Sequence, residues 1–152
     1  MSLRSKKTWL ADNNIKVVIN PSTNSLEDEQ IVVYQKDRKT MEWKPLKQTI
    51  NVKNHKYGKQ CIYILVFPWD KSKNQRVTMT LQRLVYLEFK GDIPEGFDID
   101  HIDGDSLNNL PSNLQAISRK DNLKKRELSQ KEISKKYREI EKNLKKQEKD
   151  LV

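Results

Sequence analysis

The chain has 152 residues, which is enough for one domain or slightly more. Its single cysteine excludes a disulfide framework and a cysteine-rich zinc site, and its net charge of +9 at pH 7 favours a polyanionic partner. No apolar segment follows the basic N-terminus, and the longest apolar run stops at Pro68. We therefore expect a cytoplasmic protein that has no signal peptide and does not associate with a membrane.

The charge is distributed unevenly along the chain. Residues 31–90 carry thirteen basic and four acidic side chains, and residues 114–152 carry thirteen basic and seven acidic ones. Between them, residues 91–113 carry six acidic side chains and no Lys or Arg. This acidic segment would repel a polyanion unless a divalent cation neutralised it. A solvated acidic loop explains the same composition, so charge alone does not decide between the two.

The pattern of apolar residues is weak in residues 1–30 and becomes typical of β-strands from residue 31 onward. Residues 1–30 predict a weakly structured N-terminal arm. Residues 31–95 predict a β-rich, DNA-binding region with a short helix near 81–90, which Gly91 and Pro94 would end. Apolar and β-branched runs separated by turn residues predict its strands, which are 31–34, 48–53, 60–67 and 76–81.

The last third predicts a strand–loop–strand–helix unit and then a charged helix. In the unit, residues 96–128, we expect strands at 97–102 and 114–117, a polar loop between them, and a helix capped by Ser118. Residues 129–152 predict a second helix, with Ser129 and Glu132 as its capping box. One side of this helix carries an apolar stripe that comprises Ile133, Tyr137, Ile140, Leu144 and Leu151. Two copies of the chain could pair through this stripe, over residues 133–151. The fold class predicted for the whole chain is α+β.

Four side chains in the strand–loop–strand–helix unit have the chemistry that phosphodiester hydrolysis needs. His101 can take a proton from water near neutral pH. Asp100 and the side-chain oxygen of Asn122 are hard ligands, which suit one Mg²⁺ or Mn²⁺ ion rather than zinc. Asn113 closes the long loop and can hydrogen-bond the backbone across it, which would fix the strand that carries His101.

Two other metal sites are excluded by spacing and by residue counts. The pattern from Asp98 to Asp100 is not an EF-hand loop, because Ile102 and Asn109 stand where a third ligand and a glutamate would be needed. A histidine-based zinc site lacks ligands, because His55 and His101 are the only histidines. A single His beside an Asp is more often a surface ion pair than a catalytic base, and His55 keeps that interpretation.

The adjacency of Asp100 and His101 sets a geometric condition. Neighbours on a regular strand point to opposite faces, so both can reach one phosphate only if the strand bends or ends there. The glycine at 104 and the polar loop after it make an end plausible. We therefore predict irregular backbone at residues 101–104.

Taken together, Asp100-His101, Asn113 and Asn122 resemble the motif of HNH endonucleases, in the form found in phage- and intron-encoded nicking enzymes. The resemblance continues upstream through residues 83–96, which read RLVYLEFKGDIPEG, and downstream through residues 105–109, covering roughly 76–126. It implies a ββα-metal fold in which Asp100 and Asn122 bind one divalent cation. His101 would be the general base, and Asn113 would orient it.

The same resemblance implies double-stranded DNA as the substrate, with one strand nicked by each active site. Gln82 stands where this family often has His, so one supporting contact would differ. The basic residues nearest the motif are the candidates for phosphate contacts, namely Arg83, Arg119, Lys120, Lys124, Lys125 and Arg126. A second basic patch could involve Trp43 together with Lys36, Arg38, Lys39, Lys44 and Lys47.

Two other functions remain open from the sequence. The chain could be a nucleic-acid-binding protein whose HNH site is vestigial, which the net charge supports and the intact Asp, His, Asn, Asn set opposes. It could also be an assembly protein that associates through the C-terminal helix. Cleavage of plasmid DNA would separate the first possibility from a nuclease, and removal of the helix would test the second.

Overall fold

The computed structural model of the chain describes residues 3–21, 30–54 and 60–150, and it has the α+β composition that the sequence predicts. Three strands near the N-terminus form an antiparallel sheet in the order β1 (Ile15–Asn20), β2 (Gln30–Lys36) and β3 (Trp43–Pro45). A short 3₁₀ helix (Leu3–Ser5) and helix α1 (Thr8–Asp12) precede this sheet.

The N-terminal segment belongs to the core. Trp9 and Leu10 of α1 and Ile15 and Val17 of β1 are all buried, and β1 pairs with β2 along its whole length. The prediction of a weakly structured arm is therefore wrong for residues 3–20, whereas residues 22–29 lie outside the described part. The segment was missed because its apolar residues are split between one turn of helix and one strand. Neither piece is long enough to show a period.

A second antiparallel sheet follows in the order β4 (Gln48–Asn54), β5 (Gln60–Val66) and β8 (Met79–Thr80). The strands predicted at 48–53 and 60–67 are confirmed to within one residue. The single strand predicted at 76–81 is wrong in its extent, because only Met79 and Thr80 form β8. Its first residue lies in β7 (Gln75–Arg76), which pairs with β6 (Trp69–Asp70) in a separate hairpin. Val77, which lies between β7 and β8 in the chain, is buried, and its N–H donates to the carbonyl of Pro68.

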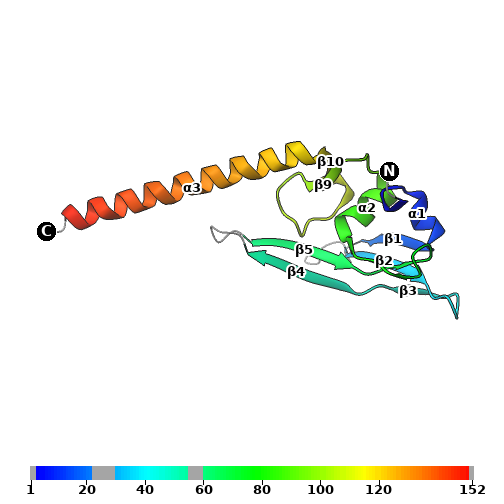
Figure 1. Ribbon diagram of the computed structural model, residues 1–152. Coiled ribbons are helices and arrows are strands. Elements are labelled where there is room, and N and C mark those ends of the chain that lie inside the picture. The colour runs from blue at the N-terminus through cyan, green and yellow to red at the C-terminus, as the bar shows by residue number, and fades with distance from the viewer. Residues whose placement is uncertain (1–2, 22–29, 55–59, 151–152) are drawn as a thin grey trace.

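Helix α2 (Leu81–Phe89) packs at the centre of the molecule (Figure 1). Its buried face consists of Leu81, Leu84, Val85 and Leu87, which join the core beneath β1, β5 and the C-terminal hairpin. The helix ends as predicted. The N–H of Gly91 donates to the carbonyl of Tyr86, and its φ of +107° is one that side-chain-bearing residues rarely adopt.

The last unit is an antiparallel hairpin, β9 (Phe97–His101) with β10 (Leu114–Ser118), followed by helix α3 (Arg119–Asp150). The Ser118 hydroxyl accepts a hydrogen bond from the Asp121 N–H at 3.1 Å, so the predicted N-cap is confirmed. The predicted break at Ser129 is wrong, because α3 runs through it as one helix of 32 residues.

Helix α3 projects away from the rest of the molecule, as Figure 1 shows. Only its first turns pack on the β9–β10 hairpin. Ile140 and Leu144 of the predicted stripe are more than half exposed, and the other side chains of that stripe are outside the described ones. Among the helices that the structure describes, none is both long and apolar enough to cross a bilayer.

Candidate active site

The β9–β10 hairpin presents two different faces. Ile99 and His101 are buried on one face, whereas Asp98 and Asp100 are half-buried on the other, where α3 begins. This alternation follows from the period of two in a strand. β9 ends at His101, and residues 102–104 form a turn in which Gly104 has a φ of +78°. The predicted irregular backbone is thus confirmed for 102–104 but is wrong for His101, which still pairs with Leu114. Asp100 and His101 therefore point to opposite faces of β9.

His101 is held by a partner that the sequence did not single out. Its Nε2 lies 2.7 Å from Oδ1 of Asn109, whose side chain is also buried. Because an amide oxygen can only accept, Nε2 donates and the neutral ring carries its lone pair on Nδ1. Nδ1 has no hydrogen-bond partner, and no buried side-chain nitrogen or oxygen in the described part of the chain lacks one. Nδ1 therefore reaches solvent.

Asn113 closes the loop between the two strands, as its sequence position predicts. Its Oδ1 accepts from the N–H of Asp103 at 3.1 Å, and its Nδ2 donates both to Oδ1 of Asp103 and to the carbonyl of Asn108, each at 2.9 Å. Its own carbonyl accepts from the N–H of Ile102 at 2.8 Å. One side chain thus fixes the backbone directly after His101.

Asp103 is the charged centre of this loop. Hydrogen bonds from the Asp105 N–H and from the side chains of Asn108 and Asn113 lower the pKa of its carboxyl group below the usual value. The nearby ring of His101 acts in the same direction. Asp103 is therefore ionised at neutral pH and is already engaged by donors of its own loop.

Asp100 lies on the opposite face of β9 and accepts two hydrogen bonds. Gln115, its cross-strand neighbour on β10, donates from Nε2 to Oδ2 at 2.9 Å. The ammonium of Lys125, in the second turn of α3, lies 2.7 Å from the same oxygen. The side chain of Asp100 is only 13% exposed, so its charge is balanced by a cation from the helix.

Asn122 lies against Asp98 rather than directly against Asp100. Its Nδ2 is 3.4 Å from Oδ2 of Asp98, and Arg119 lies 3.9 Å from the other oxygen of the same carboxylate. Asp98 and Asp100 are two residues apart on one strand, so both face the start of α3. The carboxylate in contact with Asn122 is therefore that of Asp98, which was not among the predicted site residues.

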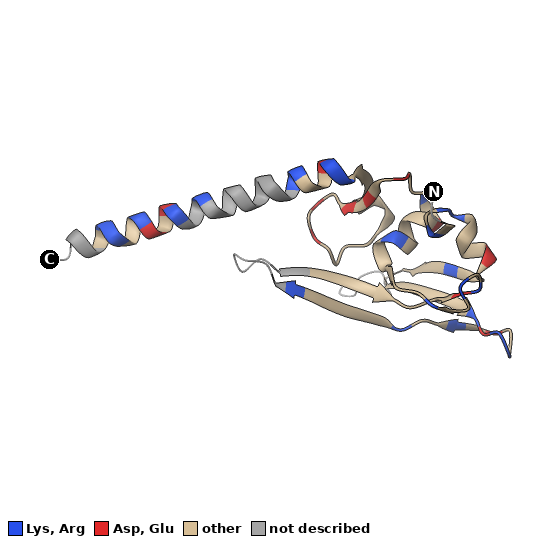
Figure 2. Cartoon of the chain, viewed as in Figure 1, with Lys and Arg blue, Asp and Glu red and all other residues tan. Residues whose placement is uncertain are grey.

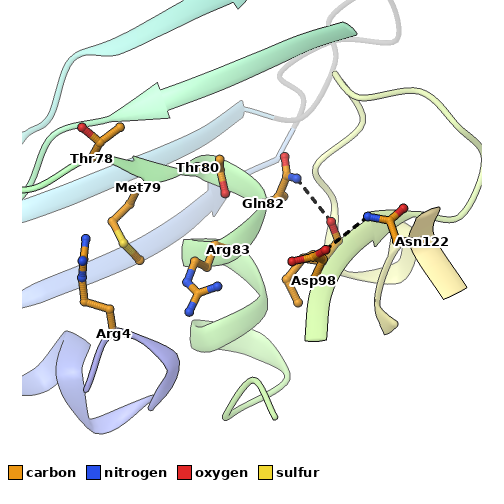
Figure 3. A pocket seen from close by; sticks show the side chains of 9 residues that line it. Arg4, Thr78, Met79, Thr80, Gln82, Arg83, Asp98 and Asn122 are labelled. Carbon is orange, nitrogen blue, oxygen red and sulfur yellow. Dashed lines mark hydrogen bonds between the residues drawn. The ribbon is translucent and has the colours of Figure 1, made fainter. Parts of the chain in front are cut away.

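A cleft of about 460 Å³ opens beside Asp98 and Asn122 (Figure 3). Arg4 and Arg83 line its other side, and Thr78 and Thr80 lie along it. Burial lowers the pKa of the Arg83 guanidinium, and the positive charge of Arg4 lowers it further, while Asp98 opposes both. The cleft therefore joins two guanidinium groups to a carboxylate and an amide, and a phosphate could lie between them.

Gln82 supports the hairpin from α2. Its buried side chain donates from Nε2 to the carbonyl of Ile99 at 3.3 Å. Arg83, the next residue, donates to the hydroxyl of Ser5 in the N-terminal segment. Helix α2 and the N-terminal segment thus both contribute side chains to the cleft, and Arg4 was not among the predicted site residues.

The side chains on this face carry oxygen groups, but they do not form a cation site as they stand, because Asn122 turns its Nδ2 toward Asp98. Two carboxylates and one amide, from Asp98, Asp100 and Asn122, are the ligand types that Mg²⁺ or Mn²⁺ prefers. No three His, Cys, Asp or Glu side chains converge within the described ranges, so an ion would depend on the amide as well. The Lys125 ammonium already brings a positive charge to Asp100 and would have to move aside.

The predicted phosphate-binding residues fall into three groups. Arg83 lines the cleft, and Arg119 and Lys125 pair with the two carboxylates of β9. Lys120 and Lys124 are exposed on the first turns of α3. The side chain of Arg126 lies outside the described ones, as does all of His55.

Comparison with known proteins bears on this unit. Residues 80–124 match a family model described as HNH endonuclease. This segment belongs to the HNH endonuclease family. The HNH match begins just before α2 and ends in the first turns of α3, so it contains Arg83, Asp98, Asp100, His101, Asn109, Asn113 and Asn122. It covers less than a third of the chain, and no curated protein and no solved structure matches.

Proposed function

We propose that the chain is a metal-dependent endonuclease that nicks double-stranded DNA. An HNH domain implies nuclease activity in general and a nucleic-acid substrate. The observation that carries the finer proposal is the β9–α3 junction. There a histidine with a solvent-facing nitrogen ends β9, and on the other face of that strand Asp98 lies against Asn122 while Asp100 pairs with Lys125.

The protein side chains would divide the work as follows. His101 would take the proton of the attacking water at Nδ1, while Asn109 holds the other ring nitrogen. Asn113 would keep the backbone after His101 in place through its bonds across the loop. Arg83 and Arg4 would bind phosphate oxygens of the DNA in the cleft, which Asp98 and Asn122 line and His101 does not.

Asp100 and Asn122, with Asp98 beside them, would hold the divalent cation, with Mg²⁺ or Mn²⁺ as the ions whose preferences fit these donors. The ion would supply positive charge to the phosphate and to the departing oxygen. Lys125 would exchange its contact with Asp100 for a contact with DNA, and Arg119, Lys120, Lys124 and Arg126 would bind flanking phosphates.

A single site per chain cuts one strand, so relaxation of supercoiled plasmid tests the proposal. In the presence of Mg²⁺ or Mn²⁺ we expect His101→Gln to lower the nicking rate about 10²- to 10⁴-fold, as loss of a general base does. Asp100→Ala should remove metal-dependent nicking. Asp121→Ala has the same charge change on the exposed side of α3 and is the matched control.

Two results would count against the nuclease. Undiminished relaxation by both site variants would end the proposal. A wild-type chain that shifts duplex DNA with strong salt dependence but leaves plasmid uncut with either ion would favour the alternative, a binding protein with a vestigial site. Thermal unfolding of each variant should accompany the assay, because His101 is buried.

Cleavage of both strands would require two chains. The exposed Ile140 and Leu144 of α3 support a homodimer through residues 133–151. A chain shortened to residue 128 should then lose its dimeric mass in solution and nick one strand only. An unchanged mass would exclude this arrangement and leave the single-strand activity intact.

A further inference from the structure

A second basic surface lies away from the HNH segment, where the β1–β2–β3 sheet meets the β6–β7 hairpin. A groove of about 670 Å³ runs between them. Six basic side chains and one acidic one line it, together with Trp69. The charged residues are Lys36, Asp37, Arg38, Lys39, Lys44, Lys71 and Arg76. None of them belongs to the segment that matches the HNH family.

We propose that this basic groove is a second binding site for the sugar–phosphate backbone of duplex DNA. The proposal rests on the nuclease function above, because it gives the same substrate another point of contact. A surface lined by six basic side chains and one acidic one attracts polyanions.

The walls of the groove are fixed by buried hydrogen bonds. Gln35 of β2 donates from Nε2 to the carbonyls of Asn13 and Trp69, and its Oε1 accepts from the N–H of Trp69 at 2.9 Å. Asn13 in turn accepts from the N–H of Lys71 at 2.8 Å. These bonds tie β2, the end of α1 and the β6–β7 hairpin together, so the cations stand on a prearranged frame.

The charge of the single acidic side chain in the groove, Asp37, is already balanced by an ion pair with Lys44. Hydrogen bonds from the N–H groups of Thr40 and Lys39, and then the ammonium of Lys44, lower the pKa of Asp37 to about 2. These contacts also hold the turn after β2, in which Met41 adopts a φ of +59°. Asp37 therefore shapes the turn that displays Arg38 and Lys39, and it leaves the groove strongly positive.

Aromatic rings extend the basic surface. The guanidinium of Arg38 lies 3.7 Å from the ring centre of Trp69, which holds it flat against the groove wall. On the outer face of the sheet, the ammonium groups of Lys16 and Lys36 lie 4.4 and 5.4 Å from the ring of Trp43. Lys36 thus joins the groove to a second cluster of cations on the sheet.

The chemistry favours duplex DNA over an acidic protein. Duplex DNA carries a negative charge about every 1.7 Å along its axis, so cations spread over a groove and an adjoining sheet can be used together. Figure 2 shows basic segments on α3 and around the turn after β2, with acidic segments in the loop after β9 between them. DNA held at the groove and at the first turns of α3 would pass β9, whose Asp98 and Asp100 would hold the proposed cation.

Binding to a short labelled duplex, measured in EDTA at several salt concentrations, tests this site without cleavage. The double variant Lys39→Gln/Lys71→Gln removes two groove cations whose side chains make no hydrogen bond or ion pair with another described residue, since their bonds involve backbone groups only. We expect it to weaken binding about tenfold, and the slope of log K against log salt to become less steep by about one to two. The matched control is Lys6→Gln/Lys53→Gln, which removes two exposed lysines outside both the groove and α3 and loses the same charge.

Three outcomes would overturn the groove as a DNA site. The groove variant could bind as the wild type does, the control could lose as much affinity, or the groove variant could lose binding to poly-glutamate while keeping the duplex. Failure of the nuclease proposal gives a different pattern, in which His101→Gln nicks normally while the groove variant still loses duplex binding.

Discussion

Strand β9 is flanked by buried amide and imidazole side chains on one face and by charged pairs on the other. On the loop side, His101, Asn109 and Asn113 are buried, and their partners are an amide, backbone groups and the carboxylate of Asp103. On the α3 side, Asp98 and Asp100 are paired with Arg119 and Lys125, side chains that are largely in solvent. The buried hydrogen bonds of the loop face hold its side chains before any ligand binds. The carboxylates of the α3 face pair instead with Arg119 and Lys125, which a metal ion can replace.

This difference suggests how a small hairpin can serve both as a fixed base and as an adaptable ion site. A base must be oriented before the reaction, and buried amide contacts do this without adding charge. Carboxylates that await an ion need a counter-charge that costs little to remove, and a surface lysine provides it. Variants on the two faces should therefore fail in different ways.

The largest effect is expected for Asn113→Ala on the buried face. The substitution removes three side-chain hydrogen bonds and leaves the Asp103 N–H and the Asn108 carbonyl without their partner. We expect a loss of about 2–4 kcal/mol in the free energy of unfolding, measured with urea. Asn108→Ala, which removes only an exposed bond to Asp103, is the control and should cost about 1 kcal/mol or less. Equal losses would mean that Asn113 does not anchor the loop.

Asn109 offers a finer test of the same face. Asn109→Ala leaves the Nε2 proton of His101 without its acceptor, and we expect the nicking rate to fall about 10- to 100-fold, equivalent to the loss of one buried hydrogen bond. Asn109→Asp should restore part of that rate. It should also move the acidic limb of the pH–rate profile to higher pH, because a carboxylate stabilises the protonated ring. A profile that keeps the wild-type limb in Asn109→Asp would show that this contact has only a structural role.

The sequence predicted the hairpin well because local rules determine it. Alternating apolar residues, a loop rich in Asn and Asp, and the Ser118 cap fix β9, β10 and the start of α3 to within one residue. The same rules failed at Ser129, where Ser-x-x-Glu occurs inside a helix. The Lys and Glu residues around it favour continuation of the helix, so no cap forms.

The partners of the site residues could not be predicted from local rules. The contact of His101 with Asn109 depends on the course of the loop after Gly104, which no periodicity describes. The pairing of Asn122 with Asp98 depends on the angle at which α3 leaves the hairpin. Arg4 enters the cleft only because the N-terminal segment folds against α2. The one usable clue was the Asn108-Asn109 pair within the family resemblance.

On the charged face, Lys125→Met tests whether the helix cation competes with the metal. Without the ammonium at 2.7 Å, Asp100 should bind the ion more readily, and half-maximal nicking should need about two- to fivefold less Mg²⁺, the scale of an exposed ion pair. Lys124→Met, one residue away and exposed, should weaken DNA binding without changing the Mg²⁺ requirement. An identical Mg²⁺ requirement in both variants would exclude the competition.

The smallest expected effect is on how far the stability of the fold falls at low pH, which tests the loop face through Asp103. Hydrogen bonds from its own loop lower the pKa of Asp103 in the folded chain, so its stabilising contribution is present above the unfolded value, about 3.9. The contribution is then lost as the pH falls through the lower folded value. Between pH 5 and about pH 3, the urea midpoint of the wild type should therefore fall further than that of Asp103→Asn, which has no carboxyl group to protonate. Asp121→Asn should keep the wild-type decline, because it removes an exposed acid outside the loop. If the urea midpoint of Asp103→Asn fell as steeply as those of the wild type and Asp121→Asn, the donors around Asp103 would not stabilise the loop through its charge. The rigidity of this face would then come from the neutral amide contacts alone.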